Sequence, residues 1–317
     1  MKATKCRMLQ GSLLLLAVLG GMPQGRSQLF PQRSMGMLNP FQDHPAAAGT
    51  RECLDLHVGY RSQWAGLEGA PTNAYANLHG AWTATQDAFH GVGGRVETDQ
   101  TGAWQSTSLG GAYAYNLPLS KGSRLAAGVG LGFYQQRLNW GMLDLPEVGA
   151  GQDAAVVGST QTVFPLVDLG LWYQNRRTYT GLTWGNVTRP ALDAIGLQSV
   201  LHRRLVWLVG TRVPLEGKWD FLPSATLRAA RGLRPSLDAV AMLDYDGKVS
   251  FGAGYRNGSA LVAMFQVDIA DYVSIGYAYD WNFSALRPGA PGGHEIVLGI
   301  NACDARSKGG LPCPAYN

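Results

Sequence analysis

Six histidines are the side chains of this protein best suited to acid–base or metal chemistry. No two of them stand four residues apart, and none has a cysteine or aspartate partner at the spacing of a zinc site. A hydrolase could gather some of them with Asp168 or Asp280, but the sequence has no GxSxG-like elbow and no paired-carboxylate motif. We therefore expect no catalytic residue, no metal ion and no cofactor. The hydrolase candidates are His57, His79 and His294, and the other histidines are His44, His90 and His202.

Three glycines, Gly128, Gly130 and Gly132, invite comparison with a phosphate-binding loop. Spacing by two on a strand places all three on one face rather than around a turn. No Lys-Ser/Thr pair follows them, and no helix is expected there. We interpret these glycines as places where inward-pointing side chains pack closely.

Charged residues of both signs recur on one face of the strands expected in the second half of the chain. A solute channel more often shows one dominant sign or a constriction, whereas mixed signs indicate a network that fills and rigidifies a lumen. We predict a plugged or narrow lumen, with an open pore as the alternative. The residues are Arg204, Arg212, Arg228, Asp238, Asp244, Arg256, Asp268 and Asp280.

The elements that position these residues are strands whose side chains alternate between apolar and polar. From Val273 to Phe283, every second residue is large and apolar, and small or polar residues stand between them. A strand sends these two sets to opposite faces. The chain offers no helix or second sheet rich enough to cover so many apolar faces, so lipid must cover them. The pattern is typical of an outer-membrane β-barrel.

Fourteen segments after residue 50 alternate in this way, so we predict an all-β, transmembrane antiparallel barrel of about 14 strands. Each is near the 9 to 11 residues that a tilted strand needs to cross a bilayer. The expected strands are 52–64, 72–82, 89–99, 105–117, 123–137, 164–174, 178–187, 201–214, 219–230, 236–245, 248–256, 260–269, 272–283 and 294–302.

The connections test this count independently. If the first strand starts in the periplasm, the long gaps 138–163, 188–200 and 284–293 all fall on the outer side, as they do in known barrels. Asp246-Gly247 is a strong signal for a two-residue hairpin.

Aromatic residues near strand ends predict interfacial girdles, and a carbohydrate platform is the less favoured alternative. These aromatics are Trp64, Trp82, Trp104, Trp172, Trp184, Trp219, Tyr272 and Trp281.

The N-terminus reads as a secretory signal peptide, with three basic residues before an apolar run from Met8 to Gly21. Cleavage after Ser27 would remove four basic residues and no acidic one, which takes the formal net charge from +4 to about zero. The charge therefore gives no reason to expect a nucleic-acid partner.

In an oxidising compartment, Cys303 and Cys313 are a candidate disulfide, and Cys53 is expected to stay unpaired.

Several separated motifs resemble the PorP/SprF family of the type IX secretion system. They are Met37 to Gly49, Tyr60 to Pro71, Tyr115 to Ser123, Tyr255-Arg256, Ala260 to Met264, Ile275 to Asp280 and Gly293 to Ile296. The chain departs from the family in having His44 where Asn is usual before Pro-Ala. It also departs in continuing from Asp304 to Asn317 beyond the last strand.

The resemblance implies a non-enzymatic barrel of the outer membrane of a Gram-negative bacterium. Such a barrel docks periplasmic ring subunits and a peptidoglycan-binding lipoprotein, or receives and anchors secreted cargo with a C-terminal signal domain. A passive porin or FadL-like solute transporter is the alternative. The expected organisation is a signal peptide (1–27), a periplasmic or lumen segment (28–50), the barrel (51–302) and a periplasmic tail (303–317).

The segment before the first strand is short, punctuated by proline and unlike a strand. We predict that it lies in the mouth or lumen of the barrel as a plug or strut. Its candidate plug and interaction residues are Asn39, Pro40, His44, Pro45 and Gly49.

Overall fold

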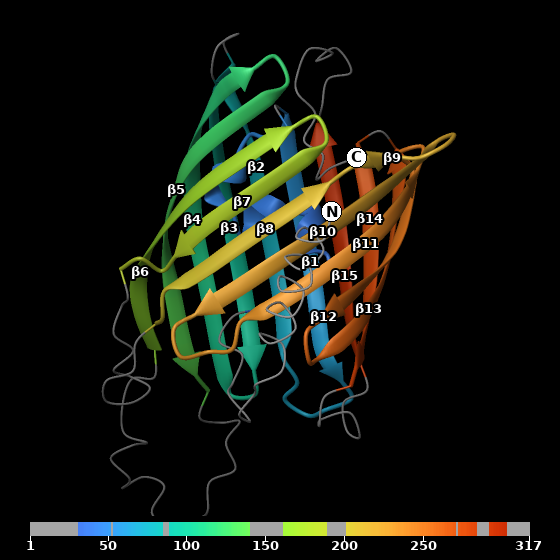
Figure 1. Ribbon diagram of the computed structural model, residues 1–317. Coiled ribbons are helices and arrows are strands. Elements are labelled where there is room, and N and C mark those ends of the chain that lie inside the picture. The colour runs from blue at the N-terminus through green and yellow to red at the C-terminus, as the bar shows by residue number, and fades with distance from the viewer. Residues whose placement is uncertain are drawn as a thin grey trace, which may run out of the picture. The chain divides into compact units, whose positions relative to one another are not determined.

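The wall of the molecule is a single antiparallel sheet that closes on itself (Figure 1). The computed structural model describes residues 31–51, 53–84, 89–139, 161–188, 201–270, 272–283 and 292–302. The first strand pairs with the last, and β10 pairs with β11, so the ring of strands has no open edge. Within these ranges, no helix is long and apolar enough to cross a membrane.

The strands follow one another around the wall in chain order. Their bounds are β1 Leu54–Ala65, β2 Thr72–Ala84, β3 Phe89–Thr101, β4 Trp104–Ser120, β5 Ser123–Leu138, β6 Gln161–Asn175, β7 Thr178–Gly185, β8 Arg204–Thr211, β9 Val213–Pro214, β10 Trp219–Ala230, β11 Ser236–Tyr245, β12 Val249–Arg256, β13 Ala260–Ala270, β14 Val273–Asn282 and β15 Gly292–Ala302.

The predicted barrel of fourteen strands is confirmed in the described residues. The two-residue β9 continues β8 after Arg212, and both pair with β10, so together they form one wall strand. Asp246 and Gly247 have φ values of 57° and 65°, the left-handed backbone that a two-residue hairpin turn requires.

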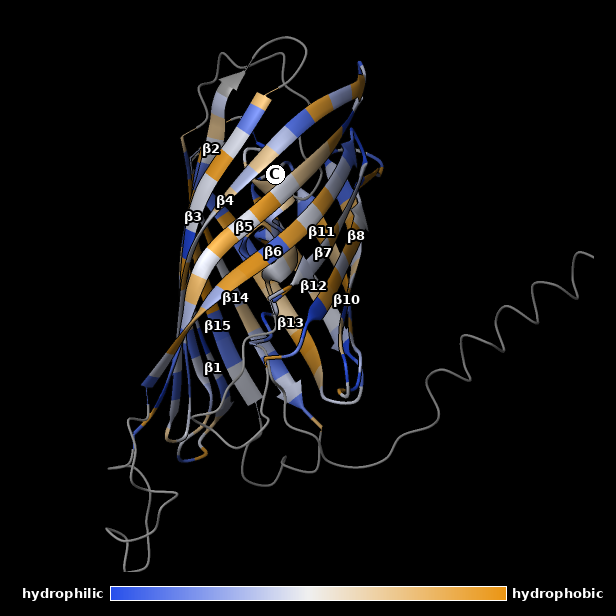
Figure 2. Cartoon of the chain, turned by 90° about the vertical axis from the view of Figure 1, so that its left-hand side faces the viewer, coloured by the Kyte–Doolittle hydropathy of each residue, from blue (hydrophilic) through white to orange (hydrophobic). Residues whose placement is uncertain are grey.

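Hydrophobic and hydrophilic residues alternate along the strands (Figure 2), and the two faces differ in exposure as this alternation predicts. On β1, Leu54 and Tyr60 are more than half exposed, whereas Asp55 and Arg61 are at most 2% exposed. Hydrocarbon can cover the outward row without a second protein layer. The polar row faces the interior, where each buried donor and acceptor needs a partner.

One of the predicted girdle aromatics lies inside the barrel instead. Trp172 is only 1% exposed and stacks on Tyr179, at a ring-centroid distance of 5.7 Å. Its neighbours Leu171 and Leu169 face outward, so the alternation along β6 turns Trp172 inward. Trp82, Trp184, Tyr272 and Trp281 do point outward, with exposures between 42% and 67%.

The expectation that Cys53 stays unpaired is wrong, because Cys53 is disulfide-bonded. The other three cysteines, Cys6, Cys303 and Cys313, lie outside the described residues, and so does the predicted bond between Cys303 and Cys313. The signal peptide and the tail after residue 302 also lie outside them.

The segment before β1 lies among the inward-facing side chains and forms three short 3-10 helices: η1 Gly36–Leu38, η2 Pro40–Gln42 and η3 Pro45–Ala47. Proline fits the first position of η2 and η3 because its missing N–H is not needed there. Every residue from 39 to 50 is buried. We call residues 31–51 the lumen segment.

Candidate functional site

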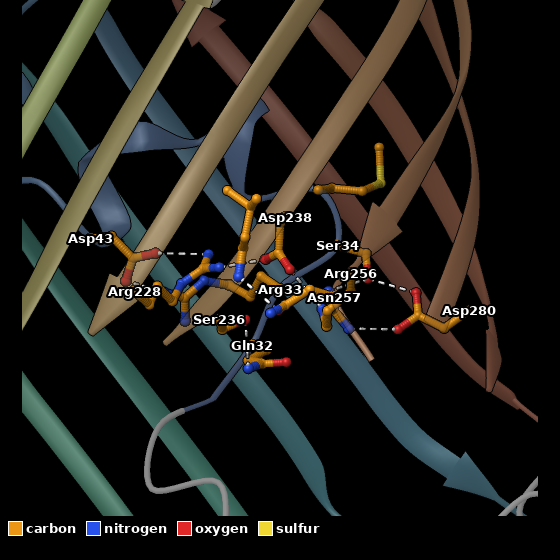
Figure 3. A network of polar contacts seen from close by, with 12 residues as sticks. Gln32, Arg33, Ser34, Asp43, Arg228, Ser236, Asp238, Arg256, Asn257 and Asp280 are labelled. Atoms are coloured by element: carbon orange, nitrogen blue, oxygen red, sulfur yellow. Dashed lines mark hydrogen bonds and ion pairs between the residues drawn. The ribbon is translucent and has the colours of Figure 1, made fainter. Parts of the chain in front are cut away.

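The lumen segment is bound at its start by a cluster of ion-paired side chains from five strands, of which Figure 3 labels Asp238, Arg256 and Asp280. The Ser34 hydroxyl donates to Asp280 at 2.6 Å, and the Ser34 backbone N–H donates to Glu295 at 2.5 Å. Arg61 donates to the Ser34 hydroxyl at 2.7 Å and forms ion pairs with both carboxylates. Arg256 bonds to Asp280 at 3.0 Å and, on its other side, to Asp238 at 3.0 Å.

A second cluster surrounds Asp43, between η2 and η3. Its carboxylate pairs with Arg33 of the same segment at 2.5 Å and lies 3.8 Å from Arg228 and 4.0 Å from Arg204. Burial would raise the pKa of Asp43, but these guanidinium groups outweigh it and hold the pKa well below its usual range. Asp43 therefore stays charged, and it ties the segment to β8 and β10.

Arg33 and Gln42 connect the segment to β2 and β3, and Arg95 of β3 extends the network to β6. Arg33 pairs with Glu97 as well as with Asp43. The side-chain oxygen of Gln42 accepts a hydrogen bond from the Asn77 amide at 2.7 Å. The backbone carbonyl of Gln42 accepts one from Arg95 at 3.0 Å. Arg95 also forms an ion pair with Asp168.

The middle of the segment is held by apolar contact. Phe41, Ala46, Ala47 and Ala48 are fully buried in a cluster with wall residues that include Ala114 and Leu208. Wall glycines make this contact close. A Cβ atom on Gly128 would lie 2.5 Å from the Ala46 Cα atom, so the segment packs directly on the backbone of β5. The sequence predicts close packing at Gly128, and the structure shows that the lumen segment is what packs there against the wall.

His44 binds to the wall through one hydrogen bond. Its Nδ1 atom lies 2.8 Å from the Thr183 hydroxyl, and its ring lies 5.8 Å from the Trp172 ring. Burial lowers the pKa of His44 to about 4, so the ring is neutral at neutral pH. The end of the segment is fixed as well, because the Gly49 N–H donates to His79 Nδ1 at 3.2 Å.

The five candidate plug residues all lie buried in the lumen segment. His44 and Gly49 bond to the wall as described, and the Pro45 ring lies 3.2 Å from where a Cβ atom on Gly170 would stand. Pro40 begins η2. Asn39 is buried, with only 2% of its surface exposed, and its side-chain amide has no hydrogen-bond partner within the described part of the chain.

Five of the seven candidate lumen-network residues meet around the segment: Arg204, Arg228, Asp238, Arg256 and Asp280. Arg212 belongs to a separate group, with Asp220 at 2.9 Å and Asp244 at 3.8 Å. Asp268 accepts a hydrogen bond from Gln266 at 3.2 Å, beside an irregularity of β13.

The residues of the hydrolase alternative do not come together. His294 lies on the outer face, 2.8 Å from the Tyr277 hydroxyl, while Asp168 and Asp280 are bound by arginines. His57 and His79 instead flank Asp55, at 3.5 and 3.6 Å. No group of three or more His, Cys, Asp or Glu side chains is arranged to hold a metal ion in the described ranges.

More than half of the network was not predicted from the sequence. The residues without a predicted role are Arg33, Ser34 and Asp43 in the segment, and Arg95 and Glu295 in the wall. Arg95 lies on β3, where glycines at 91, 93 and 94 weaken the alternation. Glu295 stands between the outward His294 and Ile296, so its inward position follows from the period of two.

These observations define a class: an outer-membrane β-barrel whose lumen holds the chain's own N-terminal segment in a buried ion network. The model of the type IX secretion system membrane protein PorP/SprF family matches residues 26–300, and the chain belongs to that family. The resemblance read from the separated motifs is thereby confirmed. No curated protein matches the sequence.

Several solved structures match this chain at low sequence identity. Omp33 from Acinetobacter baumannii is 9% identical, with 79% of this chain and 99% of that chain covered and a TM-score of 0.46. The toluene transporter TodX of P. putida is 12% identical, covering 82% and 91%, with a TM-score of 0.44. BamA from Haemophilus ducreyi is 10% identical, covering 78% and 70%, with a TM-score of 0.43.

Proposed function

We propose that this barrel is a closed, non-enzymatic scaffold of the type IX secretion system. It docks secretion-machinery proteins at its periplasmic end, or receives exported cargo at its outer end. The partners are periplasmic ring subunits and a peptidoglycan-binding lipoprotein, or a cargo protein with a C-terminal signal domain. Membership of the PorP/SprF family supports the secretion role.

The observation that carries the closed state is the bonding of the lumen segment across the barrel. Ser34 binds side chains of β1, β12, β14 and β15, and Asp43 lies against arginines of β8 and β10. A passive pore needs a continuous water path, and here buried side chains and backbone occupy the middle of the lumen. A filled barrel supports a role at its two ends better than a role in solute transport.

Two measurements test this function. Affinity purification of the tagged protein from outer membranes is expected to recover the ring proteins, the lipoprotein or a signal-domain cargo. Conductance of the purified protein in planar bilayers is expected to be low. A large constitutive current, together with no recovery of any of these proteins, would favour the transporter alternative.

A further inference from the structure

Two neighbouring hairpins carry cations that no carboxylate of the described residues neutralises. Lys121 lies in the β4–β5 turn, and Arg176 and Arg177 form the β6–β7 turn. All three residues are exposed, and no ion pair joins them to a described acidic residue. No acidic residue occurs in 117–130 or in 170–183.

The two turns are held side by side. The β5–β6 ladder pairs Ser123 with Asn175, and Arg176 Nε lies 3.8 Å from where a Cβ atom on Gly122 would stand. The Asn175 carboxamide oxygen accepts hydrogen bonds from the N–H groups of Arg177 and Thr178, both at 2.8 Å. This side-chain turn fixes the direction of the β6–β7 hairpin. The strand pairing and this turn therefore bring the three cations to adjacent turns at one end of the barrel, and we call Lys121, Arg176 and Arg177 the cation cluster.

The cluster lies at the depth of lipid headgroups. The last outward row that is matched across β4, β5 and β6 is Leu117, Leu125 and Tyr173, and Leu119 extends it on β4 by two residues toward the turn, with an exposure of 54%. The cations follow that row by three or four residues, roughly 10 Å along a strand at about 3.3 Å per residue. With a strand tilt of about 45°, the drop is roughly 7 Å, about the thickness of one headgroup layer.

We propose that Lys121, Arg176 and Arg177 bind the phosphate of an anionic glycerophospholipid in the adjacent leaflet. Guanidinium groups suit phosphate because they present paired donors, and the outward leucines beside them suit the acyl chains. The connection parity puts this end of the barrel in the periplasm, where the leaflet of the outer membrane is glycerophospholipid. An acidic protein is the competing occupant, and it is less favoured because the cations stand within headgroup depth rather than beyond it.

A neighbouring turn pair provides the matched control. Lys218 and Lys248 lie at the same end of the barrel, but the Asp246 carboxylate is 2.7 Å from one and 3.8 Å from the other. The hydrogen bond to Asp246 raises the pKa of Lys218, and the same bond lowers the pKa of Asp246. Because their charge is already shared with a carboxylate, these lysines should contribute little to binding of an anion.

Native mass spectrometry of the purified barrel, titrated with phosphatidylglycerol and with phosphatidylcholine of the same acyl chains, tests the site. The variant Lys121→Gln, Arg176→Gln, Arg177→Gln should bind phosphatidylglycerol about 100-fold more weakly, at roughly fivefold per cation. Lys121→Gln alone should lose about fivefold if the triple variant does not fold. Lys218→Gln with Lys248→Gln should bind as the wild type does, and soluble glycerol phosphate should not compete.

Four outcomes would overturn the lipid site. Equal binding of the two lipids, or equal loss in the control variant, would remove the role of these three cations. Full competition by glycerol phosphate would indicate a site for free phosphate. Unchanged lipid binding by the triple variant with reduced secretion would assign the cations to a protein partner.

Discussion

At the scale of single residues, the lumen segment is held by buried charges that each have an opposite charge within reach. Arg256 is 4% exposed and contacts two carboxylates as well as the Ser34 hydroxyl. Buried ion pairs add little net stability compared with apolar contacts, but removing one partner is costly because the other charge stays buried. The network therefore specifies where the segment lies more than it stabilises the wall.

The substitution Asp43→Asn tests this specificity. It keeps the size of the side chain but leaves Arg33, Arg204 and Arg228 with one carboxylate fewer, so docking of the segment should weaken by about 3 kcal/mol. Thermolysin should then cleave within residues 31–51 of the folded barrel, as measured by mass spectrometry of the fragments.

The control for this experiment is Asp246→Asn, in an exposed turn far from the segment in the chain. It also removes a carboxylate that pairs with two cations, and it should leave the protease resistance of residues 31–51 unchanged. Equal protection of the segment in the Asp43 and Asp246 variants would contradict the specifying role of Asp43.

At the scale of elements, the fit between segment and wall depends on strand positions that have no side chain. Gly128 of β5 meets Ala46, Gly91 of β3 meets Ala48, and Gly276 of β14 meets Met35. A strand interior ordinarily disfavours glycine, which packs nothing and costs conformational entropy. Here each glycine admits the backbone or a side chain of the segment.

Gly128→Ala should displace the segment without breaking the wall. The added methyl group would stand 2.5 Å from the Ala46 Cα atom, and overpacking of this kind costs about 1 to 3 kcal/mol. Gly111→Ala on β4 is the matched control, because its methyl group would meet nothing closer than 3.7 Å. Both variants should keep the heat-modifiable migration of a folded barrel on gels, and Gly128→Ala alone should expose residues 31–51 to protease.

The seam between the first and last strands makes a further prediction about Cys53. The β1–β15 ladder pairs Leu54 with Ala302, and Cys53 and Cys303 are the residues next to this pair in the sequence. We predict that Cys53 is bonded to Cys303. By chain entropy, closing a loop of this length would contribute about 5 kcal/mol, more than a bond between Cys303 and Cys313.

Tryptic mapping without reduction distinguishes the two partners, because Arg306 and Lys308 lie between Cys303 and Cys313. The peptide that begins after Arg51 should be linked to the one that ends at Arg306. A link to the peptide that begins at Gly309 would show that Cys313 is the partner.

The strands could be predicted from the sequence because each depends on local alternation, and the fourteen segments fall within a few residues of the observed bounds. Contacts of the lumen segment could not, because Ser34 and Glu295 are 261 positions apart and no local pattern links them. The inward position of Trp172 was predictable from the phase of β6, but its residue type suggested a girdle. The bond at Cys53 depends on barrel closure, which no single strand encodes.

At the scale of the whole molecule, the lumen segment makes the barrel a filled cylinder. Deleting residues 31–50 should leave a membrane-inserted barrel with ionised side chains, such as Arg61 and Asp280, facing water instead of the segment. The bilayer conductance of this variant should exceed that of the wild type, and cells that carry it should admit large antibiotics such as vancomycin. Identical conductance of the two proteins would show that the segment does not close the lumen.

The bond between Ser34 and Glu295 also orders the events of biogenesis. Ser34 leaves the ribosome early, but its acceptor belongs to the final strand, so the N-terminal segment cannot lock until the last strand has arrived and the ring has closed. In a chain truncated before β15, the lumen segment would stay unanchored even if the earlier hairpins formed. Docking of the lumen segment therefore requires that synthesis and insertion of the barrel are both complete. Chains in which the segment stays undocked would be open to periplasmic proteases.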